Sequence, residues 1–300
     1  MDLFKESENL VLFKVEKDGL NLQDFLYHKD LSGRLFRRLY KDKKIYVNGK
    51  LMRKNLILQK GDLVSLLFED EEENTDAEVM DLDIIYEDFD LLIVNKDSNT
   101  VVHPTKSHQH GTLSNGLSYY FKEKGIKKKI RFVNRLDMDT TGILIVAKNP
   151  FAHQQIALQF ESLSVEKRYK AIVRGIVEKD TGTIDLPIGR EETDSIKKTV
   201  IDGGQGAITK YKVIERYKDA TLVDVQILTG RSHQIRVHFH HIGHPIIGDS
   251  LYGEKSPFIE RQSLHSYYIK IKHPRNKEDI EFIASLPNDM ERLVEHLNDK

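Results

Sequence analysis

The sequence predicts an α+β protein with a small N-terminal module and a larger domain behind it. The apolar run from Ile143 to Ala147 is typical of a strand buried on both faces. Residues 222–228 alternate between apolar and polar, as in a half-buried strand, whereas residues 22–39 show helical spacing. We expect the module to span residues 1–70, an acidic linker to span 71–81, and the larger domain to span 82–300.

The composition is that of an ordinary globular protein. Of the 300 residues, 39% are hydrophobic and 31% are charged. Cysteine is absent, which excludes disulfides, thiolate nucleophiles and cysteine metal sites. Because we find neither a signal peptide nor an apolar run long enough to cross a bilayer, we expect a cytoplasmic protein without a membrane partner.

Charge is segregated along the chain, although the net charge is only −1. Residues 29–60 contain eleven Lys or Arg against two Asp, and residues 122–131 contain six Lys or Arg against one Glu. Such patches attract polyanions over about 8–10 Å, although a single basic run is more often a solvated helix face. Residues 69–90 contain twelve acidic residues and no basic one. Residues 69–81, which are poor in core formers, predict a flexible linker extended by self-repulsion.

The N-terminal module is predicted to contain two helices followed by a hairpin. Residues 22–26 have helical spacing, and Ser32 can cap a second helix. Asn48-Gly49 is a strong hairpin signal, and a closing strand follows at 63–68. This arrangement resembles the S4-type RNA-binding module. The side chains expected to contact RNA phosphates lie on or just after the second helix: Arg34, Arg37, Arg38, Lys41 and Lys44.

Further elements of the larger domain follow from the same kinds of signal. Thr112 begins a helical pattern that ends at Gly125, and Asn149-Pro150 is a fitting helix start. We expect strands at 84–86, 91–96, 167–173 and 264–271, and helices at 112–125, 149–160 and 290–297.

Two polar clusters have residue types suited to catalysis. Asp137 lies on a loop at the mouth of the buried strand, where a scaffold can hold a reacting group; a turn that merely contains Asp is the alternative. In the second cluster, Ser232 is expected to cap a helix, which places Arg231 just before the helix. A nucleophilic carboxylate must stay ionised when water is excluded, and a nearby guanidinium favours that state. We therefore expect Arg231 to pair with Asp137; a purely structural ion pair is the alternative.

Five histidines between His233 and His244 suggest a metal-dependent hydrolase as a rival hypothesis. No HExxH-type motif is present, and no carboxylate stands at ligand spacing. We therefore favour a site without a catalytic metal. The glycine cluster at 203–206 lacks a following Lys-Ser/Thr, so a flexible turn is favoured over a phosphate loop.

Residues 80–290 resemble the RluA family of RNA pseudouridine synthases through three separated motifs. Residues 134–142, Asn-Arg-Leu-Asp-Met-Asp-Thr-Thr-Gly, are similar to the family's H-R-L-D-x-x-T-S-G. Residues 167–175 fit K-x-Y-x-A-x-V-x-G. Residues 229–253 fit T-G-R-x-H-Q-I-R-V-H and then I-G-H-P-I-x-G-D-x-x-Y-G. The resemblance implies a mixed, largely antiparallel catalytic sheet, which an S4-like module precedes in many members.

The resemblance also implies a reaction, the isomerisation of uridine in RNA to pseudouridine, with no metal and no cofactor. We expect the protein to be a monomer. Asp137 would be the nucleophile, Tyr169 would stack on the base and assist proton removal, and Arg231 would keep Asp137 charged. Arg135 would hold the extruded base or fill the gap it leaves, since the target must be flipped out or single-stranded. The other residues expected to contact the substrate are Asn134, Thr140, His233, Gln234, Arg236 and Leu264.

Three positions depart from the family pattern. Asn134 replaces a His, Thr141 a Ser, and Asp97 the Pro of an early Lys-Pro motif. The main rival hypothesis is a catalytically impaired RNA-binding protein on the same fold, which Asn134 favours and Asp137 opposes. Among substrates, ribosomal RNA is favoured over transfer RNA, and the sequence does not identify the modified uridines.

Overall fold

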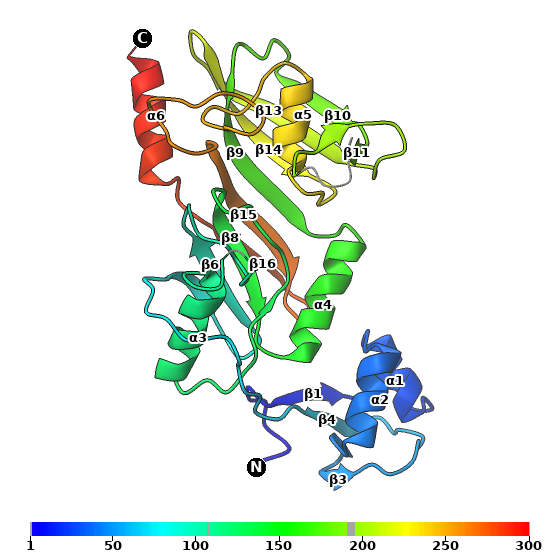
Figure 1. Cartoon of the computed structure of the whole chain (residues 1–300). Helices are drawn as coiled ribbons and strands as arrows, with labels where there is room; N and C mark the ends of the chain where they lie inside the picture. The colour runs from blue at the N-terminus through cyan, green and yellow to red at the C-terminus, as the bar shows by residue number, and fades with distance from the viewer. Residues whose placement is uncertain (1, 107, 191–195, 300) are drawn as a thin grey trace.

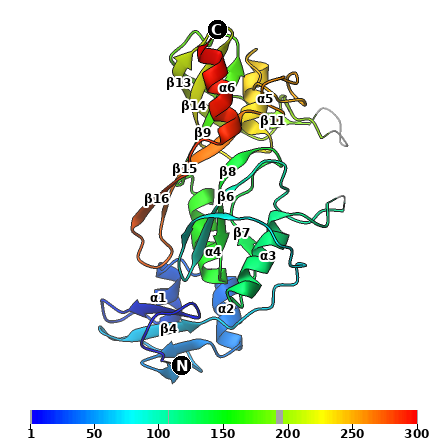
Figure 2. The same cartoon turned by 90° about the vertical axis from the view of Figure 1, so that its left-hand side faces the viewer.

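The computed structural model describes residues 2–106, 108–190 and 196–299 (Figure 1). Within these residues the chain forms a four-stranded sheet near its N-terminus, and a ten-stranded sheet and a small two-stranded sheet in the remainder. Helices lie beside both sheets (Figures 1 and 2). The fold is therefore α+β, which confirms the class predicted from the sequence. None of the described helices is both long enough and apolar enough to span a membrane.

The N-terminal unit packs two helices against a sheet of strand order β1-β4-β2-β3. Its elements are β1 (Leu10–Lys14), α1 (Leu22–His28), α2 (Gly33–Lys41), β2 (Ile45–Val47), β3 (Lys50–Leu51) and β4 (Leu63–Leu67). Ser32 caps α2 by accepting a hydrogen bond from the Leu35 amide. Asn48 and Gly49 both have positive φ, as the predicted tight hairpin requires.

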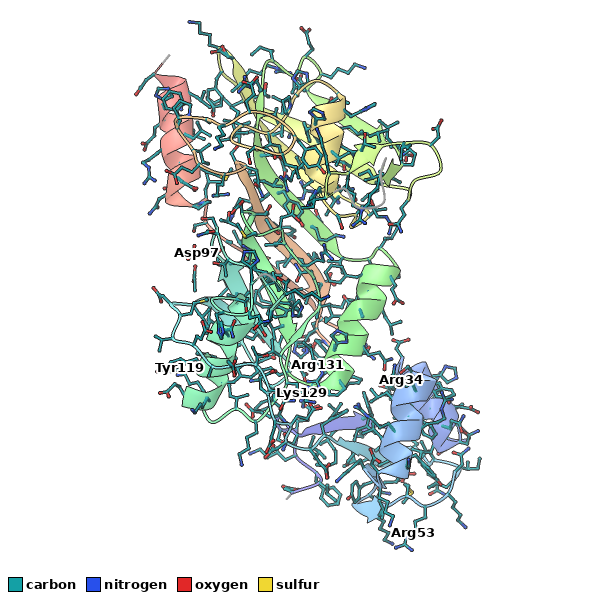
Figure 3. The ribbon with its side chains drawn as sticks, viewed as in Figure 1. Arg34, Arg53, Asp97, Tyr119, Lys129 and Arg131 are labelled. Atoms are coloured by element: carbon teal, nitrogen blue, oxygen red, sulfur yellow. The ribbon has the colours of Figure 1, made fainter. Side chains whose placement is uncertain are left out.

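The acidic segment after β4 lies against the larger domain, so the prediction of a flexible, self-repelling linker is wrong. The Glu71 carboxylate pairs with Arg131 at 2.6 Å, and Glu73 accepts a hydrogen bond from the Ile130 amide at 2.7 Å. Ser118 donates to the Thr75 carbonyl at 2.7 Å. The second basic run supplies cations and backbone donors that offset the repulsion among these carboxylates. Figure 3 shows Lys129 and Arg131 at the end of the larger domain that faces the N-terminal unit.

The N-terminal unit is docked on the larger domain through aromatic and polar contacts. The ring of Phe151 packs into the N-terminal core, edge-on to Phe13 at a centroid distance of 5.8 Å. Arg275 donates to the carbonyls of Ser7 and Leu10, each at 2.9 Å, and its Nε donates to Asp90 at 2.6 Å. Asp90 is fully buried, so this ion pair ties the N-terminal strand to the interior of the larger domain.

The larger sheet has the order β10-β13-β14-β9-β15-β8-β6-β5, with β16 beside β15 and β7 beside β8. Its strands are β5 (Asp83–Glu87), β6 (Leu91–Lys96), β7 (Arg131–Phe132), β8 (Thr141–Ala147), β9 (Glu166–Arg174), β10 (Thr181–Asp185), β13 (Ile208–Arg216), β14 (Ala220–Ile227), β15 (Leu264–Lys272) and β16 (Asp279–Ile283). The remaining elements are α3 (Leu113–Glu123), α4 (Pro150–Glu161), β11 (Ile188–Gly189), β12 (Thr199–Val200), α5 (Gln234–His241) and α6 (Asn288–Asn298).

Strand β8 lies inside this sheet, and all seven of its residues are buried, as the sequence predicts. Among the described strands of the sheet, only β8 and β15 pair in parallel, which confirms a mixed, largely antiparallel sheet. At that pairing Gly142 has φ +112°, and a Cβ added there would lie 2.2 Å from the Ser266 carbonyl oxygen. Glycine therefore allows the loop before β8 to approach the start of β15.

Candidate active site

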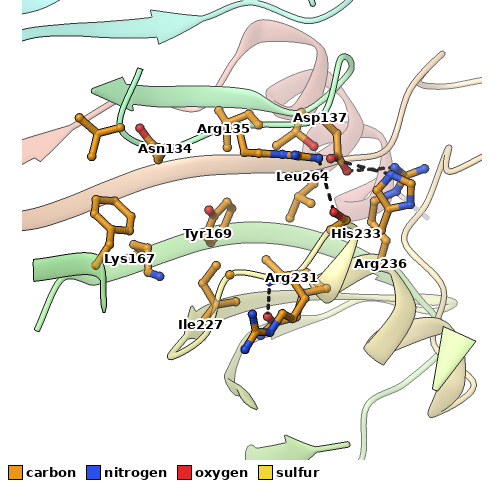
Figure 4. Close-up of a pocket in the computed structure, with 18 residues that line it drawn as sticks. Asn134, Arg135, Asp137, Lys167, Tyr169, Ile227, Arg231, His233, Arg236 and Leu264 are labelled. Atoms are coloured by element: carbon orange, nitrogen blue, oxygen red, sulfur yellow. Dashed lines mark hydrogen bonds and ion pairs between the residues drawn. The ribbon is translucent and has the colours of Figure 1, made fainter. Parts of the chain in front are cut away.

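A cavity of about 270 Å³ lies where distant parts of the sequence meet (Figure 4). Its walls come from the loop before β8, strand β9, the start of β15 and the turn into α5. Its volume is close to the lower end of the range of small-molecule pockets, about 300–1,000 Å³. Every residue that the sequence predicts as catalytic or substrate-binding lines it: Asn134, Arg135, Asp137, Thr140, Tyr169, Arg231, His233, Gln234, Arg236 and Leu264.

Asp137 is held by a turn that is bonded to the neighbouring strand. The Thr140 amide donates to the Asp137 carbonyl at 3.1 Å, which closes the turn. Asn134 donates to the Ile143 carbonyl at 3.1 Å and accepts from the Ile145 amide at 2.8 Å. Asn134 thus fixes the loop to β8. Its side-chain amide bonds backbone groups and does not serve as a substrate contact.

The guanidinium beside Asp137 belongs to Arg236. Its Nη1 lies 3.0 Å from Asp137 Oδ2, and its Nε and Nη2 donate to Asp249 at 2.7 and 2.8 Å. The prediction that Arg231 pairs with Asp137 is wrong. The Arg231 Nε donates to the Gly206 carbonyl at 3.0 Å, and Figure 4 shows this side chain pointing away from Asp137.

Burial disfavours the charged form of Arg236, but its hydrogen bonds and ion pairs with Asp249 and Asp137 outweigh that effect and raise its pKa. Burial raises the pKa of Asp249, but the hydrogen bonds and positive charge of Arg236 lower it by more, so the pKa lies below its usual value. Asp249 therefore holds one side of a permanently charged guanidinium, which leaves Nη1 to face Asp137.

The start of α5 explains why Arg236 and not Arg231 reaches the carboxylate. His233, not the predicted Ser232, is the N-cap, and its backbone is left-handed with φ 58° and ψ 19°. His233 and Arg236 are three residues apart and therefore share a face of the chain as it enters the helix, whereas Arg231 precedes the left-handed turn. His233 and Arg236 both lie near Asp137. The three-residue spacing between them in the sequence is the signal that could have identified Arg236 as the partner of Asp137.

His233 is close to Asp137 but is not its charge partner. Its Nε2 is 4.0 Å from Asp137 Oδ1, and its Nδ1 is 2.8 Å from the Tyr252 hydroxyl. Burial lowers the pKa of His233 below its usual range, and the nearby Asp137 opposes this only in part. The imidazole is therefore neutral at pH 7, and the positive charge beside Asp137 is that of Arg236.

Tyr169 supplies an aromatic wall between the two ends of the cavity (Figure 4). Burial raises its pKa to about 12. Its hydroxyl is therefore protonated at neutral pH, whereas an effective general base has a pKa near the working pH. With Ile227 and Leu264, which also line the cavity, Tyr169 offers a surface suited to a flat, weakly polar ring.

Two other predicted substrate contacts are already engaged within the fold. Gln234 is buried, accepts from Thr229 Oγ1 at 2.8 Å and from the Arg231 amide at 3.0 Å, and donates to β13 through its Nε2. Thr140 is also buried, and its Oγ1 accepts a hydrogen bond from Gln262 at 3.2 Å. Gln234 and Thr140 shape the cavity wall.

Arg135, in contrast, is exposed at the edge of the cavity. Its Nη2 lies 3.4 Å from the Ser232 hydroxyl, so the side chain reaches from the Asp137 loop toward the turn into α5. This position suits the predicted contact with an extruded base.

Lys96, which was not among the residues predicted from the sequence, holds the loop of Asp137 through hydrogen bonds. It is 1% exposed, and its Nζ donates to the carbonyls of Asp97, Thr100 and Met138 at 2.6, 3.0 and 2.7 Å. Burial lowers its pKa to about 8, although the charge of Asp139 opposes this. Lys96 lies in the early Lys-Pro motif, so the motif was a signal for this position.

Of the five histidines between His233 and His244, one is buried and bonded within the fold, and His240 and His241 are exposed. His238 is fully buried, with Nδ1 2.9 Å from Thr209 Oγ1 and Nε2 3.0 Å from the Leu186 carbonyl. In the ranges that the structure covers, no three His, Asp or Glu side chains converge as a metal site would require.

The predicted RNA-binding cations of the N-terminal unit lie on α2 as expected. Arg34, Arg37, Arg38 and Lys41 are exposed, whereas the three buried residues of the helix face the core. Figure 3 shows Arg34 at the end of α2 nearer the larger domain. Lys44 differs, because it is half-buried and its ammonium pairs with Glu69.

Comparison with known proteins decides the family. Residues 90–241 match the family model described as RNA pseudouridylate synthase. The chain belongs to that family. It is 44% identical over 262 residues to an uncharacterized RNA pseudouridine synthase, YlyB, of Bacillus subtilis, with 86% of each chain covered.

The ribosomal large subunit pseudouridine synthase D of Pseudomonas aeruginosa is 36% identical over 266 residues, covering 83% of this chain and 82% of the relative. The solved structure of human RNA pseudouridylate synthase domain containing 1 is 28% identical, covers 75% of this chain and 97% of its own, and has a TM-score of 0.59. The protein is thus an RNA pseudouridine synthase, an isomerase that acts on RNA, which confirms the enzyme class predicted from the sequence.

Proposed function

We propose that this synthase isomerises uridines of large-subunit ribosomal RNA, with Asp137 as the nucleophile. The observation that carries the proposal is the Asp137 carboxylate lining a cavity with the Arg236 guanidinium 3.0 Å away. Several curated relatives named as large-subunit synthases, at 33–38% identity, support the ribosomal substrate.

The chemistry follows from the residues around the cavity. Asp137 attacks the bound nucleotide at the ribose or the base, and the bond between C1′ and N1 breaks. The uracil turns on the wall formed by Tyr169, Ile227 and Leu264, and a bond forms between C1′ and C5. The bond between the Asp137 oxygen and the nucleotide breaks, which restores the carboxylate. The hydrogen on C5 leaves as a proton and N1 takes up a proton, so the product is an isomer of the substrate. Because Tyr169 stays protonated, we expect water to accept the proton from C5.

Access to the base requires that it leaves the RNA stack, at a cost of a few kcal/mol. Arg135 at the cavity edge is placed to occupy the gap or hold the extruded nucleotide. The cations of α2 contribute phosphate contacts that position the RNA without reading its sequence. We propose that the protein acts as a monomer. A ribosomal substrate is in keeping with a cytoplasmic protein.

The test uses large-subunit ribosomal RNA labelled with tritium at uridine C5 and transcribed without modification. The wild-type protein should release tritium, whereas Asp137→Asn should release none, because an amide cannot act as the nucleophile. Asp139→Asn, two residues away, is the matched control and should retain turnover. Equal release by Asp137→Asn would overturn the catalytic assignment, and release from transfer RNA alone would overturn the ribosomal one.

A further inference from the structure

Lys167 lines the cavity but has no part in the reaction proposed above. It lies on β9 two residues before Tyr169, so both side chains point to the same face of the strand. Figure 4 shows Lys167 toward one end of the cavity, Asp137 at the other end, and Tyr169 between them. A ligand that reaches Asp137 across Tyr169 therefore extends toward the Lys167 ammonium.

The Lys167 side chain is largely buried, and its ammonium has no counter-ion within the described residues. The residue is 8% exposed, its Nζ lies 5.2 Å from the ring centroid of Phe160, and no carboxylate offsets its loss of hydration. Burial alone lowers its pKa to about 8. Two other buried lysines are satisfied differently: Lys96 donates to three carbonyls, and Lys148 donates to Glu87 and to the Asp88 carbonyl.

A buried cation without an oxygen partner is costly, and a negatively charged ligand relieves that cost. The ring of Phe160 offers a weaker, partial compensation. Of the groups that a nucleotide carries, only the phosphate brings a full negative charge, whereas the base carbonyls bring a neutral hydrogen bond. Arg135 and Arg231 also line the cavity and add further positive charge to it.

We propose that Lys167 is a subsite for one RNA phosphate, that of a nucleotide bond adjoining the uridine held in the cavity. The proposal rests on the proposed function, because it takes the cavity to receive a nucleotide of an RNA strand. With the phosphate at Lys167, the reacting sugar at Asp137 and the base on Tyr169, the cavity holds the nucleotide at three points and so fixes the register of the strand.

The experiment measures binding of a fluorescent single-stranded oligouridylate at several salt concentrations. Lys167→Met keeps the length of the side chain and removes its charge. We expect roughly tenfold weaker affinity, as for the loss of one charge-assisted hydrogen bond. The slope of log K against log salt should become shallower by about 0.7, the value for one phosphate on a single strand. An unchanged slope would overturn the proposal.

Lys170→Met is the matched control. Lys170 is on the same strand with its side chain on the opposite face, and its Nζ also lies over an aromatic ring, 4.7 Å from the centroid of Tyr267. Its removal subtracts the same charge and a similar ring contact outside the cavity. We expect the affinity and the slope of Lys170→Met to match those of the wild type; an equal loss in both variants would mean a general charge effect and would overturn the subsite.

A second measurement serves if Lys167→Met fails to fold. In the wild type, uridine 5′-phosphate or uridine 3′-phosphate should displace the oligouridylate at lower concentration than uridine does. In Lys167→Gln this advantage of the phosphate should vanish. Competition by uridine as strong as that by both phosphates would overturn the proposal.

These binding measurements do not depend on turnover, so the two proposals fail separately. A wild-type protein that binds through Lys167 but releases no tritium from any RNA would overturn the proposed function and leave the subsite standing. Normal tritium release together with RNA binding that does not depend on Lys167 would overturn the subsite and leave the proposed function standing.

Discussion

Arg236 serves two carboxylates at once, and the two are in different environments. Asp249 is fully buried and takes two of its hydrogen bonds, whereas Asp137 is partly open to the cavity and takes one. The bond to Asp249 fixes the plane of the guanidinium, and that plane presents Nη1 to Asp137. The position of Asp137, the proposed nucleophile, therefore depends on a carboxylate that does not line the cavity.

Arg236→Lys should lower kcat by about 100-fold while the protein remains folded. Lysine keeps the positive charge but cannot bind Asp249 in a bidentate manner and hold Asp137 at the same time. The measurement is tritium release under saturating RNA, with thermal unfolding as the check on folding. Arg231→Lys is the matched control and should change kcat much less, because Arg231 does not touch Asp137. A larger loss in Arg231→Lys would contradict the pairing described above.

His265 should make stability depend on pH. It is fully buried on β15 with its Nδ1 2.8 Å from Thr141 Oγ1, and burial lowers its pKa to about 4. Between pH 6.5 and 4 the unfolded chain binds this proton and the folded chain does not. The contribution is therefore complete above pH 6.5 and is lost as the pH falls, by up to about 3 kcal/mol.

His265→Asn should flatten the fall in unfolding free energy between pH 6.5 and 4, because asparagine does not titrate there. Urea unfolding at several pH values measures it. His241→Asn, at an exposed position, should leave the pH dependence as in the wild type. Identical curves for His265→Asn and the wild type would show that another group causes the acid sensitivity.

At the scale of elements, the loop of Asp137 is held by its neighbours more than by its own turn. Strand β8 supplies backbone partners for Asn134, and Gly142 permits the close parallel contact with β15. Lys96, at the end of β6, bonds three carbonyls of two loops. The loop that carries Asp137 is thereby held by three adjacent strands of one sheet.

Lys96→Met should destabilise the protein by about 3 kcal/mol and lower turnover as well. Methionine fits the space, but the buried carbonyls of Asp97, Thr100 and Met138 lose their donor. Urea unfolding gives the stability, and tritium release by the folded fraction gives the turnover. Lys122→Met, at an exposed position on α3, should change neither. Turnover unchanged in a destabilised Lys96→Met would limit the role of Lys96 to stability.

At the scale of the whole molecule, the docked N-terminal unit gives α2 a fixed place relative to the cavity. Phe151, Arg275 and the acidic segment all cross between the two parts. Removal of residues 1–70 would expose the Phe151 ring and leave Arg275 without two carbonyl partners. Substitution of surface charges is therefore a cleaner probe of the unit than its deletion.

Replacing Arg34, Arg37, Arg38 and Lys41 together by Gln should weaken RNA affinity and flatten its salt dependence by about 0.7–0.9 for each phosphate that the variant no longer binds. The reaction itself should persist at saturating RNA, because α2 does not line the cavity. Filter binding over a salt series measures the effect. Substituting Lys44 should matter less, since Glu69 already pairs with it. Unchanged salt dependence in the fourfold variant would exclude α2 from the RNA interface.

Local patterns sufficed for the elements whose signals are short-range. The apolar run of β8, the Ser32 and Asn149 caps and the Asn48-Gly49 hairpin all form where the sequence predicts them. The motifs also identified the residues that line the cavity. The strand, caps and hairpin depend on residues only a few positions apart, so they can be predicted directly from the sequence.

Only the tertiary structure decided which cation meets Asp137 and what becomes of the acidic segment. The left-handed turn at His233 directs Arg231 to one side and Arg236 to the other, and no propensity predicts that turn. The acidic segment packs against the larger domain because Arg131, some sixty residues later in the chain, pairs with the Glu71 carboxylate. Charge pairing between residues so far apart in the sequence depends on how strands and loops pack. The sequence pattern does not show how close two such charges lie in space.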